Sequence, residues 1–394
     1  NERVDKAIVG PGAGMLIGVQ TMEMLFEEAD AWHKRKPLRI FFSPTGTVLT
    51  QEKIKELYNM ITSDQYQGHV SFFASRYEGY DARGEEEYAD IVLSVGDYVL
   101  MGGDLPSMTT CEALLRYLPG VIGKKDSVEN DSFSGACLDY DHYAKPLEWR
   151  NKKVPEVLRS GDHKKIADWQ HNNALSHTLL KRFDWWRKYN TTLKQREEVL
   201  QKIPSHYVVL MHDHVMMPDG TVGSSSVTSI DIHDIARSCA TYGIKGFYIV
   251  TKLTAQQELV KTFLRFWHSE TGQSCNEHRA HAVSAVTLYD SVDKIIADIK
   301  EKEHQNAPLT IVTSSRRNIG HSNMISYYDQ GVIWKKNKPL LFVFGTAHGL
   351  SPEYMEKADY KLVPIEGLKE FNFLSVRSAV AIILDRWMGI NPTL

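Results

Sequence analysis

The adjacent glycines Gly102 and Gly103 follow an apolar run that begins at Ser94, and Pro106 follows three residues later. This order indicates the end of a strand, a tight backbone crossing and the start of a helix that continues from Met108 to Leu118. Because glycine has no Cβ, the main chain can approach a ligand or another segment closely there. Ordinary turns show the same pattern, so by itself it leaves ligand binding and turn formation both open.

Three polar, glycine-containing loops end predicted strands in the first third of the chain, at residues 43–46, 75–79 and 94–106. In a parallel α/β sheet such loops meet at the carboxyl edge of the strands, where ligands bind. A further apolar run leads into a glycine loop between Phe344 and Leu350. We therefore expect one ligand-binding edge in each half of the chain.

Hydrophobic spacing predicts the elements that carry these loops. In the first half it indicates helices at 22–32 and 51–61, strands at 38–42 and 69–74, and two strand-like pieces within 89–100. A basic helical region at 154–186 and a charged helix or linker at 187–204 come next. A second pattern then predicts strands at 206–211, 246–250, 309–313 and 339–344, and helices at 231–242 and 374–388. Strands that alternate with helices indicate α/β domains with largely parallel sheets.

The chain has 394 residues, of which 42% are hydrophobic and 24% charged, as is typical of a globular protein with two or three domains. No apolar run is long enough to span a bilayer, so we expect no membrane segment. The four cysteines (Cys111, Cys137, Cys239 and Cys275) have no CxxC spacing, which argues against a zinc site and favours the reducing cytoplasm. The opening residues resemble the interior of a domain, and we expect further sequence before Asn1.

The charge of the chain is unevenly distributed. The net charge of −3 gives no general sign of a nucleic-acid-binding protein. Between His142 and Lys202, however, there are 14 Lys and Arg residues against 7 Asp and Glu residues. Such an excess is typical either of a solvated helical face or of a surface that binds phosphates.

Many ordered motifs in the first half match one family. They are SPTGT (Ser43–Thr47), SRYEGYD (Ser75–Asp81), SVGDYVLMGGDLPSM (Ser94–Met108), LLRYLPGVIG (Leu114–Gly123), ENDSF (Glu129–Phe133), LDYDHYAKP (Leu138–Pro146), VPEVLRSGDH (Val154–His163) and IADWQ (Ile166–Gln170). Through them, residues 3–185 resemble the bacterial tRNA (guanine-N1)-methyltransferases, the TrmD family. The agreement of so many motifs in order makes the resemblance specific.

The second half resembles the SPOUT-class RNA methyltransferases, the superfamily that also contains the TrmD family. Its matching motifs are IDIHDIARSCATYG (Ile230–Gly243), FGTAHGLS (Phe344–Ser351) and VPIEGLKEFNFLSVRSAVAIIL (Val363–Leu384). The nearest subgroup is that of bacterial SPOUT proteins found fused behind a TrmD domain. Asp231 stands where this class usually has asparagine, and residues 372–375 depart from its common SLN order.

The resemblance implies an α/β fold of two SPOUT-type methyltransferase domains, each with a trefoil knot that binds S-adenosylmethionine, and a helical tRNA-binding segment between them. We expect the first domain at 1–123, a flexible interdomain loop at 124–140, the helical tRNA-binding subdomain at 141–189, a linker at 190–205 and the second domain at 206–394.

By this resemblance, the first half transfers a methyl group to N1 of the guanosine 3′ of the tRNA anticodon. Asp131 matches the base that removes the N1 proton, and Arg116 matches the residue that stabilises the charge on guanine O6. An aspartate, with a reference pKa of about 3.9, cannot deprotonate guanine N1 without such help. Outside these motifs, Asp131 would suit a helix cap and Arg116 an exposed helix cation.

Twelve residues match the cofactor contacts of the TrmD family: Pro44, Tyr77, Glu78, Gly79, Ser94, Val95, Gly96, Tyr98, Leu100, Gly102, Gly103 and Pro106. Glu78 is also a candidate ligand of a hydrated Mg²⁺ ion, because the family is magnesium-dependent. An exposed loop glutamate without any ion is the alternative.

The resemblance also implies a homodimer in which one chain supplies the cofactor site and the other supplies Asp131. The target base has to leave the anticodon stack. The basic region with Trp149, Trp169, Trp185 and Trp186 fits the binding of phosphates and the stacking of bases. Tryptophans at helical spacing suit a hydrophobic core equally well.

Enzymes of the second branch typically methylate a ribose 2′-oxygen, and Arg237 matches their reactive arginine. Because arginine stays protonated, we interpret its role as the positioning of charge. The matching cofactor contacts are Thr313, Phe344, Gly345, Thr346, Gly349, Leu350, Ile365, Gly367 and Leu374. Asn276 and Arg279 lie in a polar insert at 272–281. A cover over the cofactor site and a solvated loop are both consistent with its sequence, and we expect the loop. The alternative for this half is a non-catalytic tRNA-binding or dimerisation module.

Overall fold

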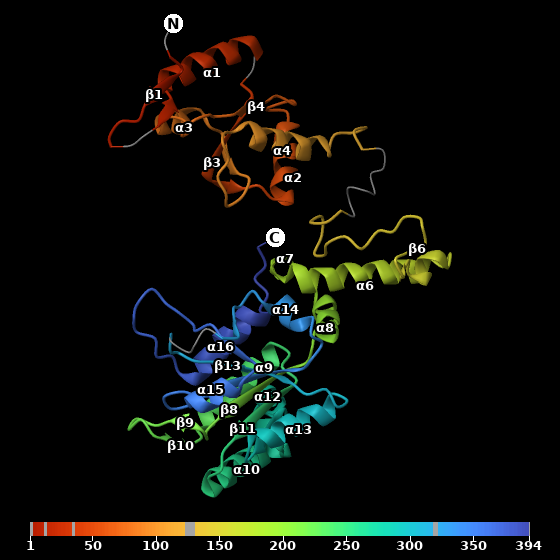
Figure 1. The fold of residues 1–394 in the computed structure, drawn as a ribbon, viewed down its shortest axis with the longest axis vertical. Helices are drawn as coiled ribbons and strands as arrows, with labels where there is room; N and C mark the ends of the chain where they lie inside the picture. Colours follow the sequence, from red (N-terminus) through yellow and green to blue (C-terminus); the bar gives the residue numbers. More distant parts are fainter. Residues whose placement is uncertain (1–2, 12–13, 34–35, 123–130, 318–321, 394) are drawn as a thin grey trace. The chain divides into compact units, whose positions relative to one another are not determined.

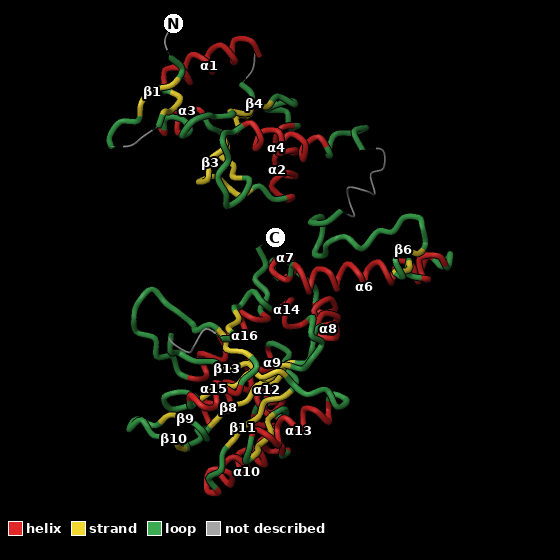
Figure 2. The backbone as a smooth tube through the Cα atoms, in the orientation of Figure 1, coloured by secondary structure: helices red, strands yellow, loops and turns green. Residues whose placement is uncertain are grey.

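The computed structural model describes residues 3–11, 14–33, 36–122, 131–317 and 322–393 (Figure 1). The chain divides into two units, Asn1–Gly135 and Ala136–Leu394. Helices and strands alternate in both, as Figure 2 shows. Residues 124–130 of the expected interdomain loop lie outside the described residues.

A parallel three-stranded sheet with the order β4-β3-β5 forms the centre of the N-terminal unit. Its strands are β3 (Leu38–Val48), β4 (Val70–Phe73) and β5 (Ile91–Ser94). The helices of this unit are α1 (Val19–His33), α2 (Gln51–Ile61), α3 (Ala82–Tyr88) and α4 (Asp104–Leu115). An antiparallel pair, β1 (Asp5–Ala7) and β2 (Met15–Ile17), precedes α1.

Both faces of this sheet are buried, as is typical of a parallel sheet. Side chains alternate along a strand. Leu38, Ile40 and Phe42 of β3 therefore pack against α2 and α4, whereas Phe41 stacks on Phe26 of α1 with 5.7 Å between ring centroids. This alternation is the sequence pattern that positions the loops at the carboxyl edge.

The predicted helix at 51–61 and the strands at 38–42 and 69–74 are confirmed, although β3 runs on to Val48. The prediction of two strands within 89–100 is wrong, because only β5 forms there. Val99 and Met101 beyond it are 89% and 100% exposed, so this stretch has no sheet to cover.

Two glycines let main-chain segments of the N-terminal unit cross at close range. A Cβ on Gly103 would lie 2.7 Å from Ala74 Cα, and the Gly103 N–H donates to Ser75 O at 2.7 Å. A Cβ on Gly46 would lie 2.6 Å from the carbonyl carbon of Leu93. Because neither crossing leaves room for a side chain, glycine is required at both positions.

A seven-stranded parallel sheet with the order β12-β11-β8-β15-β13-β16-β14 forms the centre of the C-terminal unit. Its strands are β8 (His206–Met211), β11 (Gly246–Val250), β12 (Val286–Tyr289), β13 (Leu309–Val312), β14 (Met324–Ile325), β15 (Leu340–Gly345) and β16 (Tyr360–Leu362). Two short antiparallel pairs are β6 (Glu148–Trp149) with β7 (Lys152–Lys153), and β9 (Val215–Met216) with β10 (Val222–Gly223).

Helices cover both faces of this sheet. They are α6 (His163–Lys181), α7 (Phe183–Trp186), α8 (Leu193–Lys202), α9 (Ser229–Thr241), α10 (Thr254–His268), α11 (Glu270–Cys275), α12 (Glu277–Val283), α13 (Val292–Lys302), α14 (Gln330–Trp334), α15 (Pro352–Lys357) and α16 (Val376–Met388). Residues of α9, α12, α14 and α16 pack on one face, and residues of α13 and α15 on the other. No helix within the described residues is long and apolar enough to cross a membrane.

The helical segment at 141–189 belongs to the C-terminal unit. Leu175 and Leu179 of α6 and Trp186 of α7 are buried in the same core as the sheet. Trp185 is buried as well, whereas Trp149 is 57% exposed. Core packing therefore accounts for Trp185 and Trp186, and Trp149 remains open to solvent.

The expectation of a loop at 272–281 is wrong, because α11 and α12 occupy most of this insert. Asn276 Oδ1 accepts a hydrogen bond from the Arg279 N–H and thereby caps α12. Ala280 and Val283 are buried against the core. The residues that pack against the core are small and add little to the hydrophobic pattern, so the sequence of the insert appears polar.

Replacing Gly103 with valine should destabilise the N-terminal unit, because the new side chain would overlap the main chain at Ala74 and Ser75. Overpacking of this kind costs about 1–3 kcal/mol. Scanning calorimetry of the full chain should show a lower transition temperature for this unit and an unchanged transition for the other. Gly135→Ala is the matched control, since nothing lies within 4 Å of its Cβ. Equal losses in both variants would contradict the crossing as the cause.

Candidate active sites

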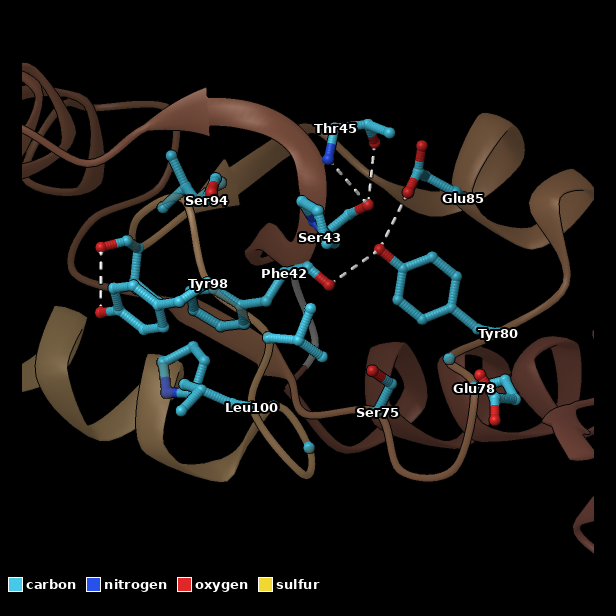
Figure 3. A pocket seen from close by; sticks show the side chains of 18 of the residues that line it. Phe42, Ser43, Thr45, Ser75, Glu78, Tyr80, Glu85, Ser94, Tyr98 and Leu100 are labelled. Atoms are coloured by element: carbon cyan, nitrogen blue, oxygen red, sulfur yellow. Dashed lines mark hydrogen bonds between the residues drawn. The ribbon is translucent and has the colours of Figure 1, made fainter. Parts of the chain in front are cut away.

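A cavity of about 560 Å³ opens at the carboxyl edge of the N-terminal sheet (Figure 3). All twelve cofactor residues expected in this half line it: Pro44, Tyr77, Glu78, Gly79, Ser94, Val95, Gly96, Tyr98, Leu100, Gly102, Gly103 and Pro106. Its volume is within the range of small-molecule pockets. The fold thus brings the loops 43–46, 75–79 and 94–106 around one space.

Four glycines contribute only main chain to the cavity wall, and two of them have positive φ. Gly79 and Gly96 have φ of 114° and 152°, a conformation that residues with a side chain rarely adopt. A Cβ on Gly96 would lie 2.5 Å from the Tyr98 ring. The Tyr98 hydroxyl folds back and donates to Val95 O at 3.2 Å (Figure 3). Its ring is 59% exposed and offers an apolar wall.

Further lining residues were not identified from the sequence: Phe42, Ser43, Thr45, Ser75, Tyr80, Ala82, Glu85, Leu93 and Val99. The Tyr80 hydroxyl lies 2.8 Å from Glu85 Oε2 and 3.2 Å from Phe42 O (Figure 3). Burial, and secondarily the hydrogen bond with Glu85, raise the pKa of Tyr80, so its hydroxyl stays protonated. The SRYEGYD motif contains Tyr80 and could have identified it, whereas the polar helix α3 gave no signal for Glu85.

Glu78 is exposed at the rim of the cavity, and its Cγ occupies the space that a Cβ on Gly14 would fill. Within the described ranges, no three His, Cys, Asp or Glu side chains converge on one point. A single carboxylate suits a Mg²⁺ ion that keeps its water ligands better than one coordinated directly by the protein.

Arg116 and Asp131, the residues expected to act on guanine, form an ion pair in which Arg116 Nη2 donates to Asp131 Oδ2. Arg116 is the C-cap residue of α4, the helix that begins beside Gly103. Each of the two side chains is 40% exposed, so a substrate can reach both. Neither residue lines the cavity of its own chain.

In the C-terminal unit, β8 and β15 lie side by side at the point where the strand order reverses, which is the usual ligand position in an open α/β sheet. Three side chains link their carboxyl ends. Thr346 Oγ1 donates to Met211 O at 2.8 Å and lies 2.5 Å from Ser225 Oγ, which lies 3.0 Å from His212 Nδ1.

The donor and acceptor in each of these hydrogen bonds can be assigned. Because Thr346 gives its only hydroxyl proton to Met211 O, Ser225 must donate to Thr346, and Ser225 Oγ then accepts from His212 Nδ1–H. His212 is fully buried, and burial lowers its pKa to about 4, so the ring is neutral at pH 7. These hydrogen bonds therefore fix Thr346 at the carboxyl ends of β8 and β15.

Neighbouring loops are tied to one another at the same edge. Arg316, in the loop that follows Thr313, donates to His348 O at 3.1 Å. Arg317 forms an ion pair with Glu366 at 3.0 Å. The loops after β13, β15 and β16 thus meet at this edge.

The nine expected cofactor residues of this half differ in their exposure. Thr313, Gly345, Thr346, Gly349, Ile365, Gly367 and Leu374 lie on the three loops or at their strand ends. The side chains of Phe344 and Leu350 are buried in the cores on opposite faces of the sheet. Only the main chain at Phe344 and Leu350 can therefore contact a ligand.

Arg237 lies apart from these nine residues, in an open cavity of about 420 Å³ between α9 and α16. Arg377 lines the same cavity and pairs with Asp231 at 3.2 Å and with Asp234 at 3.6 Å. This ion pair accounts for an aspartate at 231 where the class usually has asparagine. Arg237 is exposed and has no ion pair among the described residues, so its charge is available to an anionic group.

Family models match both halves of the chain. A model described as tRNA (Guanine-1)-methyltransferase TrmD matches residues 1–188. A model described as SAM-dependent RNA methyltransferase matches residues 205–389.

Among curated relatives, a tRNA (guanine-N(1)-)-methyltransferase of Nitratidesulfovibrio vulgaris is 36% identical over 392 residues, which cover 98% of this chain and 88% of the relative. A tRNA (guanine-N(1)-)-methyltransferase of Oleidesulfovibrio alaskensis is 38% identical over 361 residues, which cover 90% of this chain and 82% of the relative. A tRNA (guanine-N(1)-)-methyltransferase of Bacillus velezensis is 38% identical over 197 residues, which cover 50% of this chain and 78% of the relative. The chain therefore belongs to the tRNA (guanine-N1)-methyltransferase family of the TrmD type, with a second SAM-dependent RNA methyltransferase domain in its C-terminal half.

Proposed function

We propose that this chain methylates RNA at two sites, with N1 of the guanosine 3′ of the tRNA anticodon as the target of the N-terminal unit and a ribose 2′-oxygen as the target of the second domain. The cavity lined by all twelve residues that match the cofactor contacts of the TrmD family supports the first assignment most directly. The protein acts as a cytoplasmic homodimer on tRNA. Both domains thread their chains into knots, the first of them at the close main-chain crossings of Gly46 and Gly103.

S-adenosylmethionine, when bound in the first cavity, supplies an electrophilic methyl group. The apolar side chains of Leu100 and Pro106 suit its adenine, and the main chain at Gly96 and Gly102 offers hydrogen-bonding groups. Glu78 would hold a hydrated Mg²⁺ ion at the rim.

The ion pair of Arg116 and Asp131 complements the edge of guanine. Guanine presents an acceptor, O6, beside a donor, N1–H. Asp131 can accept the N1 proton while Arg116 donates a hydrogen bond to O6. Loss of the N1 proton places negative charge on O6, and the Arg116 guanidinium stabilises that charge. The two side chains exchange their mutual contact for contacts with the base.

Asp131 serves the cavity of the second chain in the proposed homodimer. The position of Asp131 outside the cavity of its own chain supports this arrangement. The active site then needs two copies, because the cavity of a monomer lacks Asp131.

In the second domain, Arg237 positions the ribose or phosphate of the RNA. Arginine side chains do not act as ordinary bases. Arg377 is neutralised by Asp231 and Asp234, so Arg237 is the charge in this cavity that is available to RNA. The loops around Thr346 would bind the cofactor. A non-catalytic tRNA-binding module is the competing assignment.

Replacing Asp131 with asparagine should lower N1 methylation about 10²–10⁴-fold, because the acceptor of the N1 proton loses its charge. Arg116→Gln should lower it about 10²–10³-fold. Mass spectrometry of digested tRNA measures the product, and calorimetry should show unchanged binding of S-adenosylmethionine. Lys53→Gln, which breaks an exposed ion pair with Glu56, is the control. A wild-type rate for Asp131→Asn would contradict its role as the base.

Replacing Arg237 with alanine should remove the methylated nucleotide made by the second domain, with a loss of about 10²-fold or more. The assay uses the Asp131→Asn chain, in which the first reaction is silenced, and labelled S-adenosylmethionine with bulk tRNA. Arg265→Ala, at an exposed position on α10, is the matched control. If Asp131→Asn already abolishes all methyl transfer, the non-catalytic module is the correct assignment.

Replacing His212 with leucine should weaken binding of S-adenosylmethionine to the second domain about tenfold, because the half-buried Ser225 hydroxyl loses its donor. His212→Asn should restore most of the affinity, since its amide can donate from the position of Nδ1. Calorimetry with two sites per chain measures the effect. Equal binding by both variants would show that the hydrogen-bond chain does not support the cofactor loop.

A further inference from the structure

We infer, on the basis of the two methyl-transfer reactions proposed above, that the second domain acts on tRNA, held by the same basic helical segment (residues 141–189) that serves the first reaction. Three observations carry this inference. They are the distribution of charge along the chain, the rigid attachment of the segment to the second domain, and the position of the cavity that contains Arg237.

Of the three parts of the chain, only the segment with its continuation to Lys202 has a net positive charge. Residues 142–202 have 14 Lys and Arg against 7 Asp and Glu. The second domain, residues 206–394, has 19 of each kind, and residues 1–141 have 13 basic against 23 acidic residues. Affinity for a polyanion comes largely from cations that neutralise phosphates. The second domain has no net charge of its own with which to hold RNA.

The basic side chains of the segment are available at one end of it. Lys152 on β7 and Lys164 near the start of α6 are exposed, and Arg150 stacks over the exposed ring of Trp149 at 4.7 Å. Exposed cations beside an exposed aromatic ring are the combination that binds single-stranded or looped RNA.

The other end of the segment is built into the second domain. The ring of Phe183 in α7 packs edge-on against Trp334 of α14 with 4.9 Å between centroids. The helices α6 and α14 lie alongside each other (Figure 1), and a Cβ on Gly331 would lie 2.1 Å from Leu180 O. Main chain therefore touches main chain at this contact, which excludes a flexible tether.

The segment also forms hydrogen bonds with α16, one of the two helices that line the cavity containing Arg237. Arg187 donates to the carbonyl oxygens of Asp385 and Arg386 at 2.9 Å each, at the carboxyl end of α16. Arg377 and Ser378, near the amino end of the same helix, line the cavity that contains Arg237. At 1.5 Å per residue, Ser378 and Asp385 are about 10 Å apart along the helix. The anchor and the cavity thus form one rigid body.

RNA held by the segment is therefore held beside the second domain. Binding of that RNA at the second cavity becomes an intramolecular event, which raises its effective concentration there. An RNA of another class would have to bind a second domain in which basic and acidic residues are equal in number. The same tRNA-binding segment serves both reactions.

The test removes charge from the segment and, separately, from the second domain. Lys152→Glu with Lys164→Glu is introduced into the Asp131→Asn chain, and methyl transfer by the second domain to unmodified tRNA is measured at several salt concentrations. Both lysines are exposed, so the fold is retained. We expect at least a tenfold higher KM and a shallower dependence of log KM on log salt, because each lost phosphate contact removes about 0.7–0.9 from the slope.

The matched control is Lys300→Glu with Lys335→Glu, two exposed lysines of the second domain. We expect it to leave KM for tRNA nearly unchanged. The inference is overturned if the control raises KM as much as the segment variant does, or if a structured RNA of equal length that is not tRNA is methylated as efficiently. Absence of methyl transfer to any RNA would instead contradict the proposed function of the second domain, so the two failures are distinguishable.

Discussion

The N-terminal unit depends on main-chain segments that cross without side chains between them. The Gly103 amide hydrogen-bonds the carbonyl of Ser75 at a distance that admits no Cβ, and Gly46 lies equally close to Leu93. These two crossings bring the ends of three strands within reach of one another. They also explain why main chain lines so much of the cavity, since side chains at the crossings would fill it.

The sequence predicted the strands and helices with a strong apolar pattern and failed where packing uses other residues. The helix at 51–61 and the strand at 206–211 have the predicted bounds. The stretch after Ser94 has strand-like residues, but it has no neighbouring strand to pair with. The insert at 272–281 forms helices because alanines pack against the core, and small residues give little hydrophobic signal.

The first site was largely predictable and the second less so, for a physical reason. The motifs of the first half lie on loops that surround one cavity, so the residues that match the family also lie together. Tyr80 and Glu85 escaped because their mutual hydrogen bond depends on the turn into α3. In the second half, the side chains of Ser225 and His212 support Thr346 through hydrogen bonds. These two residues precede Thr346 by about 120–135 positions, so no local sequence pattern reveals the link.

The boundary between the two family matches does not coincide with the boundary between the two units. The TrmD model extends to residue 188, whereas the structure divides the chain after Gly135. Leu175, Leu179, Phe183 and Trp186 are buried in the core of the C-terminal unit. Burial of a large apolar side chain contributes about 1.5–3 kcal/mol, so these four contribute roughly 6–12 kcal/mol. A typical domain is stable by about 5–15 kcal/mol in total. The second domain therefore depends for its fold on a segment whose sequence belongs to the first family.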